Sequence, residues 1–200
     1  RCYRDWLWKA YDLKAAAAAR PEWAGEVSLA LSWCPCNAEL LDALAERRLP
    51  ERTLLHVPGW RRDAYDQNYP RYEPSDEGRA FVRRALEMGF RVMPHFNYFC
   101  ADPSHPIYRE LYDYQMREPR TRRLQGWSWV EGNMLGNPQG HGQLPKHRRH
   151  NVMAYIHPGL SRWRRELGGR IARAVEELGL DAVFVDQTLC TWNCVNALVE

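Results

Sequence analysis

Four short apolar segments that alternate with amphipathic segments limit the fold of this chain most strongly. The apolar segments span residues 27–33, 53–57, 90–96 and 182–185. Amphipathic segments with helical spacing lie at residues 37–48, 75–88, 104–116 and 160–178. This alternation predicts a parallel sheet whose strands are joined by crossover helices. Both an eight-stranded (β/α)8 TIM-type barrel and a doubly wound open sheet satisfy the order.

The boundaries of two helices are marked in the sequence. Ser75 is suited to cap a helix, and Asp76 follows it in the first turn. The segment 160–178 has apolar residues at steps of three and four, and Gly179 follows it. The apolar run 182–185 then predicts a strand that is buried on both faces and ends at Asp186.

The length of the chain bears on the choice between the two folds. A complete barrel usually needs about 250 residues, whereas this chain has 200 residues and four strand–helix units. We therefore expect an N-terminal helical segment at 1–26 and the N-terminal half of a barrel at 27–200, with the remaining half downstream. Residues 117–151 are rich in Arg, Gly, Pro and His, which predicts an insertion between the third and fourth strands. A hairpin is expected near 127–135.

Composition and motifs exclude several classes of function. The formal charge of +3 is too small to indicate a nucleic-acid partner, and no apolar stretch approaches the ~20 residues of a membrane span. His141, His147, His150 and His157 lack a recognised metal-ligand arrangement, so no metal is expected. The G-x-S-x-G nucleophile elbow is missing, and so are the phosphate-loop and dinucleotide motifs. No cofactor is expected. Carboxylate chemistry remains, and the sequence does not indicate a compartment.

Candidate site residues follow from the ends of the predicted strands. In parallel α/β folds, the residues just past the carboxyl ends of the strands line the ligand site. Asp186 is therefore the candidate catalytic acid. Rings, carboxylates and amides are suited to bind sugar faces and hydroxyls, which predicts a carbohydrate substrate. The candidate substrate-binding residues are Trp60, Asp63, Asp66, Tyr69, His95, Asn97, Glu131 and Gln187. For each of them, a packing or loop-stabilising role is the alternative.

Several strand-end motifs in this order resemble a known group of enzymes. They are Gly59-Trp60, residues 69–74, residues 94–97, residues 153–159 and the G-x-D-x-x-x-x-D pattern from Gly179 to Asp186. Together they resemble barrel glycoside hydrolases of the α-galactosidase and endo-α-N-acetylgalactosaminidase superfamily, including poorly characterised bacterial barrel domains of that group. The chain departs from the pattern in Gln187, which follows the aspartate, and in the basic insertion.

The resemblance implies a retaining mechanism. Asp186 would be the nucleophile, and the acid/base would come from a later strand outside this chain. Two alternatives of other classes stay open. One is a non-catalytic carbohydrate-binding barrel, and the other is a self-contained doubly wound α/β enzyme or binding module.

Overall fold

The structure is a computed structural model of the chain. It describes residues 2–47, 49–117, 119–120, 122, 124–130, 133–134, 141–143 and 152–186. Two predicted site residues, Glu131 and Gln187, lie outside this part of the chain. Among the described residues, no helix combines the length and apolar character needed to cross a membrane.

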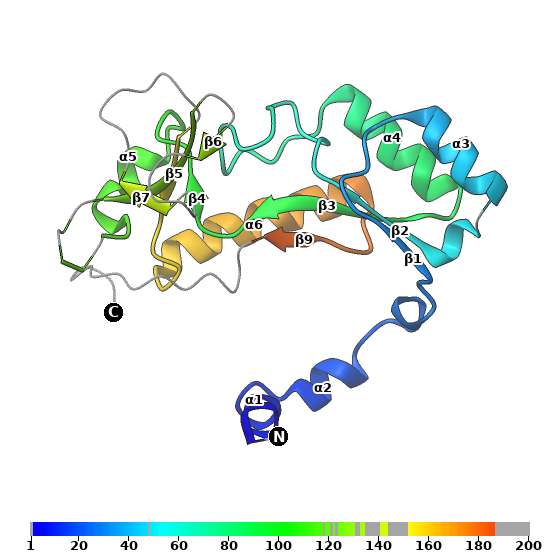
Figure 1. Ribbon diagram of the computed structural model, residues 1–200, viewed down its shortest axis with the longest axis horizontal. Helices are drawn as coiled ribbons and strands as arrows, with labels where there is room; N and C mark the ends of the chain where they lie inside the picture. The colour runs from blue at the N-terminus through cyan, green and yellow to red at the C-terminus, as the bar shows by residue number, and fades with distance from the viewer. Residues whose placement is uncertain are drawn as a thin grey trace.

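Four parallel strands form a curled half-barrel sheet in a mixed α/β fold (Figure 1). They are β1 (Leu29–Leu31), β2 (Thr53–Val57), β3 (Arg91–Asn97) and β9 (Phe184–Asp186). The spatial order β1-β2-β3-β9 follows the order of the chain and does not reverse. A doubly wound sheet requires a reversal of strand order, so the four described parallel strands do not have that topology.

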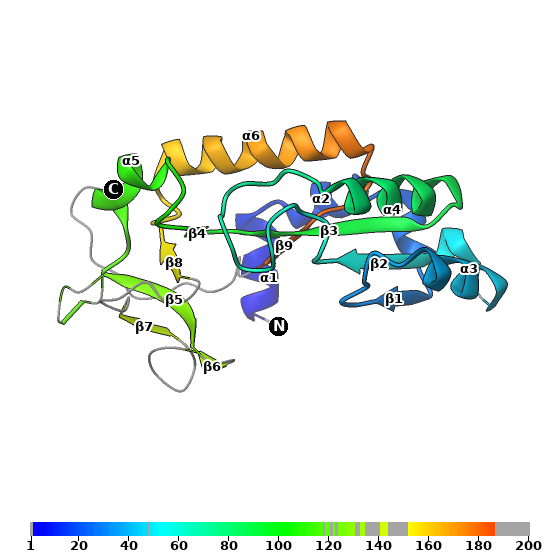
Figure 2. The same ribbon diagram turned by 90° about the horizontal axis from the view of Figure 1, so that it is seen from above.

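Helices cover the outer face of this sheet. The crossover helices are α3 (Ala38–Arg47), α4 (Asp76–Glu87) and α6 (Ser161–Leu178). Figure 2 shows α4 and α6 running along the same side of the sheet. Their apolar faces pack on outward strand residues, and the resulting core includes Phe81, Trp163, Val92 and Phe96, each at most 5% exposed. The opposite face of the sheet presents the other set of alternating side chains.

The predicted caps are present in the structure. The Ser75 hydroxyl accepts a hydrogen bond from the Gly78 N–H at 2.9 Å at the start of α4. Gly179 ends α6 with φ of 66°, a left-handed conformation that costs glycine little. These two ends explain why both helices are predictable to within a residue or two.

A second, antiparallel sheet lies beyond the carboxyl end of β3 (Figure 1). It consists of β4 (Cys100–Ala101), β8 (Val152–Tyr155), β5 (Gln125–Val130), β6 (Asn133–Met134) and β7 (His141–Gln143). The expected hairpin is present, because β5 pairs with β6 through Trp129 and Met134. The pairing of β5 with β8 was not predicted, since it joins segments far apart in the sequence.

Three predicted elements differ from the structure. The helix expected at 104–116 is reduced to α5 (Tyr108–Leu111) and a 3-10 turn at Tyr112–Tyr114. The strand expected at 27–33 is limited to β1, because Trp33 has a φ of 57° that no strand adopts. The last strand begins two residues later than expected, at Phe184, and it includes Asp186.

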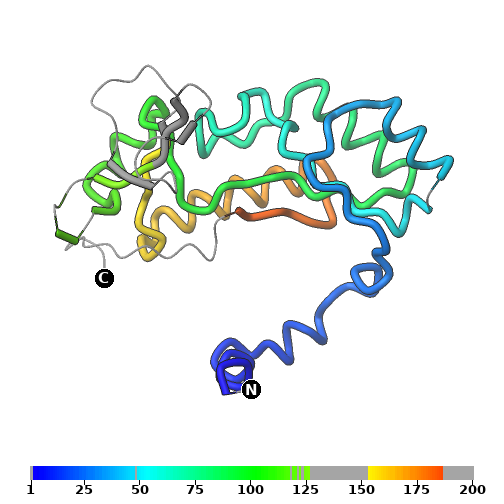
Figure 3. Tube along the Cα trace, in the orientation of Figure 1, coloured from blue at the N-terminus to red at the C-terminus, as the bar shows by residue number. Residues whose placement is uncertain are grey.

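The N-terminal segment extends away from the rest of the chain, as the tube in Figure 3 shows. It contains α1 (Cys2–Ala10), α2 (Leu13–Ala18) and a 3-10 turn at Glu22–Gly25. The expected helical segment is divided at Asp12, whose φ is 46°. None of the described residues in these three elements is buried.

Candidate functional site

The carboxyl ends of β2, β3 and β9 bring two histidines and one aspartate together. Asn97 pairs with Asp186 in the sheet, and His95 pairs with Phe184. His95 Nε2 lies 3.9 Å from Asp186 Oδ2. The side chain of Asp186 is 32% exposed, whereas that of His95 is 3% exposed. A carboxylate open to solvent therefore lies beside a buried imidazole.

The hydrogen bonds around the two histidines determine which ring nitrogens carry protons. The backbone N–H of Trp33 donates to His56 Nδ1 at 3.5 Å, and the Ser32 hydroxyl lies 3.3 Å from the same atom. Because a backbone N–H can only donate, His56 Nδ1 is the acceptor and Nε2 carries the proton in a neutral ring. His56 Nε2 then donates to His95 Nδ1 at 3.3 Å. A neutral His95 consequently carries its proton on Nε2, the atom that faces Asp186.

Burial keeps both imidazoles neutral. The pKa of His95 is lowered to about 3, mainly by burial and further by His56 and the Arg61 guanidinium. Burial also lowers the pKa of His56, although the charge of Asp186 opposes this shift. Near neutral pH, the group next to Asp186 is therefore an uncharged N–H donor.

Aromatic side chains surround these polar groups. Trp33 is 59% exposed, and its ring centroid lies 5.0 Å from that of Tyr65. The Tyr65 ring lies 5.3 Å from that of His95, and Phe184 packs on His56 at 4.5 Å. Exposed flat rings beside polar groups are suited to bind the apolar face of a sugar. The left-handed φ of Trp33 is unusual for a residue with a large side chain and indicates local strain.

Five of the predicted sugar-binding residues are buried, and three of them, Trp60, Asp66 and Tyr69, lie in the loop after β2. Trp60 is 0% exposed, and its Nε1 donates to the backbone carbonyl of His95 at 3.0 Å. Tyr69 is 0% exposed, and its hydroxyl donates at 3.2 Å to Asp66, which is 5% exposed. The Arg61 guanidinium lies 4.5 Å from the centre of the Tyr69 ring. Because the Trp60 and Tyr69 rings have no exposed surface, they do not stack on a ligand in this conformation.

Asp63 contributes to the conformation of the loop between β2 and α4. It accepts a hydrogen bond from Asn68 Nδ2 at 3.3 Å and lies 3.8 Å from Arg71 Nε. Arg61 donates from its NH1 to the carbonyls of Gln67 and Arg71 at 3.1 and 2.9 Å. These contacts give Asp63 a loop-stabilising position, the alternative considered from the sequence.

Asn97 turns the chain after β3 beside Asp186. Its Oδ1 accepts hydrogen bonds from the N–H groups of Phe99 and Cys100 at 3.2 and 3.0 Å. Its backbone N–H donates to the Tyr72 hydroxyl at 2.9 Å. Asn97 is 2% exposed, so it fixes the end of β3 and, through pairing, the position of Asp186.

The sequence reasoning missed Trp33 and His56, because both lie inside segments that read as apolar strands. The signal that could have found His56 is alternation. Apart from Thr53, His56 is the only polar side chain in the segment Thr53–Val57. It lies one position before the end of that segment. A histidine at such a position faces the interior of a barrel near its carboxyl end.

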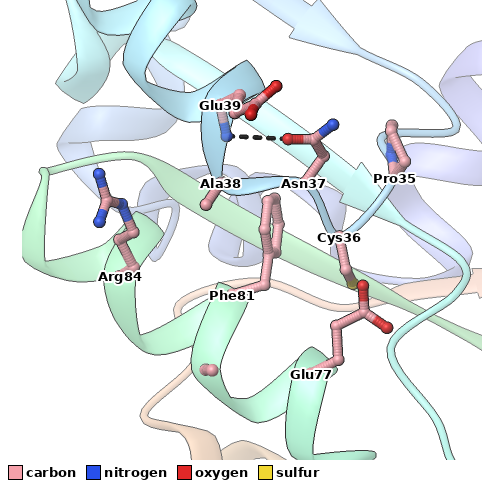
Figure 4. Close-up of a pocket in the computed structure, with 9 residues that line it drawn as sticks. Pro35, Cys36, Asn37, Ala38, Glu39, Glu77, Phe81 and Arg84 are labelled. Carbon is pink, nitrogen blue, oxygen red and sulfur yellow. Dashed lines mark hydrogen bonds between the residues drawn. The ribbon is translucent and has the colours of Figure 1, made fainter.

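A separate pocket of about 750 Å³ lies between the 35–39 loop and α4 (Figure 4). Asn37 caps α3 there by accepting a hydrogen bond from the Glu39 N–H at 2.8 Å. Burial, with smaller contributions from Glu77 and Cys34, raises the pKa of the Cys36 thiol to about 12. This pocket therefore presents no activated nucleophile. Within the described residues, no cluster of His, Cys, Asp or Glu is arranged to hold a metal ion.

The fold resembles solved structures of glycosidases. The α-N-acetylgalactosaminidase NagBb from Bifidobacterium bifidum, in complex with Gal-NHAc-DNJ, matches 81% of this chain with a TM-score of 0.56 and 16% identity. Its quadruple mutant matches with a TM-score of 0.52. TtGalA, an α-galactosidase from Thermus thermophilus in complex with stachyose, gives 0.49 over 80% of the chain at 16% identity.

These similarities concern the fold, since the identities are low. This chain spans 24% of the NagBb structure and 32% of the TtGalA structure. No curated protein matches the sequence. A family does match over nearly the whole chain, because residues 1–198 fit the family described as Domain of unknown function (DUF6259). The chain therefore belongs to the DUF6259 family.

Proposed function

We propose that this chain supplies the nucleophile-bearing part of a retaining glycoside hydrolase barrel, with Asp186 as the nucleophile. The observation that supports this most is the position of Asp186. It ends the fourth parallel strand, its side chain is 32% exposed, and the buried His95 N–H faces it at 3.9 Å. A carboxylate at the carboxyl end of a barrel strand is the arrangement that barrel enzymes use for catalysis.

The chemistry proceeds in two displacements. A carboxylate oxygen of Asp186 forms a bond to the anomeric carbon, and the bond to the leaving oxygen breaks with its electron pair. A second carboxylic acid about 5–5.5 Å away protonates that oxygen. Its carboxylate then removes a proton from water, whose oxygen bonds to the anomeric carbon while the bond from Asp186 to that carbon breaks. We assign this acid/base to a later strand outside this chain. The glycosidic bond is thus hydrolysed with retention.

The substrate class that we propose is an O-glycoside of galactose or N-acetylgalactosamine in α-linkage. The fold resemblance to NagBb supports this choice. We assign the apolar sugar face to Trp33 and Tyr65, which offer ring surface beside His95. Trp60, Asp63, Asp66 and Tyr69 act indirectly, because their contacts hold the loop and strand ends that carry the site.

The test is turnover by the intact protein that contains this chain, with p-nitrophenyl α-galactoside and α-N-acetylgalactosaminide as probes. Asp186→Asn should lower kcat by about 10⁴-fold or more, as removal of a covalent nucleophile does. The matched control is Asp181→Asn, whose carboxylate pairs with Arg91 before β9 begins and is 41% exposed. This control should keep wild-type turnover.

A trapping experiment identifies the nucleophile directly. An activated fluorosugar should label one peptide of the wild-type protein, and mass spectrometry should find the sugar on Asp186. Wild-type turnover in the Asp186→Asn variant, or a label on another residue, would contradict the assignment. Sugar binding without any turnover by the wild-type protein would favour the carbohydrate-binding barrel instead.

A further inference from the structure

One buried polar atom at the site lacks a hydrogen-bond acceptor. His95 Nε2 has almost no accessible surface and no hydrogen-bond partner. Buried N–H groups are nearly always paired, because an unpaired one loses the hydrogen bond that it makes with water. The carboxylate of Asp186 faces this nitrogen at 3.9 Å. The structure therefore presents a donor aimed at the proposed nucleophile.

We infer that His95 is a positioning residue for Asp186, held as a neutral Nε2–H donor by His56 so that it orients one carboxylate oxygen and favours the ionised carboxylate. This inference rests on the proposed function of Asp186. It differs from a sugar-binding role for His95, because Nε2 is closed to solvent and faces the carboxylate. The interaction leaves the proton on the imidazole throughout.

The protonation of the two histidines is determined by Trp33, which follows β1 at the other end of the strand order from β9. The Trp33 N–H donates to His56 Nδ1, and His56 Nε2 donates to His95 Nδ1. Trp33 follows β1, His56 lies on β2, His95 lies on β3 and Asp186 lies on β9. Each of the four parallel strands thus contributes one member of a single chain of donors and acceptors. The residue that donates this N–H, Trp33, has a left-handed φ of 57°.

The surroundings oppose a positive charge on His95. His56 on β2 and Arg61 in the loop after β2 both disfavour the imidazolium, and burial acts in the same direction. Tyr65, from the same loop, packs its ring on His95, and so does Phe184 on β9. His95 consequently acts as a hydrogen-bond donor, and its interaction with Asp186 is not a salt bridge.

The separation of 3.9 Å is longer than a hydrogen bond. Catalytic hydrogen bonds are often long before substrate binds and shorten in the complex. The side chain of Asp186 is 32% exposed, so its carboxylate has room to rotate and to bring Oδ2 closer to Nε2. Substrate at the exposed side of Asp186 would hold that rotation.

Nitrogen-15 NMR of the intact protein with labelled histidine tests the arrangement without any need for activity. His95 should remain neutral from pH 5 to 8, with its proton on Nε2, and the neutral form of His56 should also carry its proton on Nε2. The Nε2 resonance of His95 should shift in Asp186→Asn, whereas the control His105→Asn should leave it unchanged. A charged His95, a proton on its Nδ1, or no response to Asp186→Asn would overturn the inference.

Kinetics test the consequence for Asp186. In His95→Leu, the acid limb of the kcat/KM profile should move to higher pH by about one to two units, since a hydrogen bond to a charged group has that worth. His95→Gln retains an N–H donor, so its acid limb should lie close to the wild-type position. KM should change less than kcat in both variants. An acid limb that stays in place in a folded His95→Leu protein would refute the positioning role.

The two proposals can fail separately. If the intact protein hydrolyses no glycoside but His95 responds to Asp186→Asn, the proposed function fails and the hydrogen bond stands. If a fluorosugar labels Asp186 but the His95 resonance does not respond, the proposed function stands and the positioning role fails. The NMR measurement uses the wild-type histidines, so it does not depend on the folding of a His95 variant.

Discussion

Replacement of Gly78 by alanine should destabilise the protein, although Gly→Ala usually stabilises a helix. Gly78 lies in the first turn of α4, where its N–H donates to Ser75. An added Cβ would lie 2.1 Å from the backbone oxygen of Trp60 and 2.8 Å from its carbonyl carbon. The same oxygen accepts a hydrogen bond from the Ser75 N–H at 3.0 Å. The strand end and the helix must therefore separate to admit one methyl group.

The expected magnitude follows from two opposing effects. Alanine in place of glycine stabilises a helix by up to about 1 kcal/mol. Overpacking against a well-packed neighbour costs about 1–3 kcal/mol, and a clash with backbone belongs at the upper end because it has no rotamer to relieve it. We expect a net loss of about 2 kcal/mol. Because Trp60 also donates to the His95 carbonyl, the shift should reach the site.

Gly169→Ala is the matched control. Gly169 lies in α6 and is exposed, and a Cβ added to it would have no other atom within 4 Å. This variant should gain up to about 1 kcal/mol, so the two variants should differ by about 3 kcal/mol, or roughly 6–12 °C in Tm for a chain of this size. Urea unfolding followed by tryptophan fluorescence measures both. Equal or higher stability of Gly78→Ala would refute the close approach of α4 to Trp60.

Two further predictions concern ionisable groups. Burial raises the pKa of Cys34 to about 11 and that of Cys36 to about 12. Iodoacetamide at pH 8 should therefore label the exposed Cys2 well before either of these thiols. Equal labelling rates of the three cysteines, measured by mass spectrometry, would contradict this prediction. Burial lowers the pKa of His95 from 6.5 to about 3, so between these values only the unfolded chain binds the proton. Stability should then fall by up to about 1.4 kcal/mol per pH unit as the pH decreases from 6.5. In His95→Gln, the free energy of unfolding should depend less steeply on pH. Urea unfolding at several pH values measures this dependence, and an equal dependence in both proteins would refute the assignment.

The regular part of the fold was predictable because its signals are local. The segment 53–57 coincides with β2, and the helix expected at 160–178 is α6 at Ser161–Leu178. Both have apolar periodicity and end at glycine, proline or a capping residue. The antiparallel sheet was not predictable in the same way. Its strands β4 and β8 pair Cys100 with Tyr155, and such long-range register has no signature in either segment.

The candidate site was predictable in its position and less so in its members. The rule of strand ends brought Asp186, His95 and Asn97 together, and they do lie side by side. The roles of these residues remain proposals. The same rule could not separate Trp60 from Trp33, because an aromatic residue at a strand end has the same pattern whether it is 0% or 59% exposed. Trp60 is buried by tertiary contacts, among them Phe96 on β3 and Tyr72 in the loop after β2.

Two departures from the locally most stable choice occur at the carboxyl ends of the strands. Glycine would adopt the left-handed φ of Trp33 without strain, and an apolar residue at position 95 would leave no buried N–H without an acceptor. The Trp33 N–H donates to His56 and His56 donates to His95, whose Nε2 faces Asp186 at 3.9 Å. A sequence tends to break local rules where function requires it. Since stability alone accounts for neither residue, the proposed function of Asp186 offers a reason for both of them.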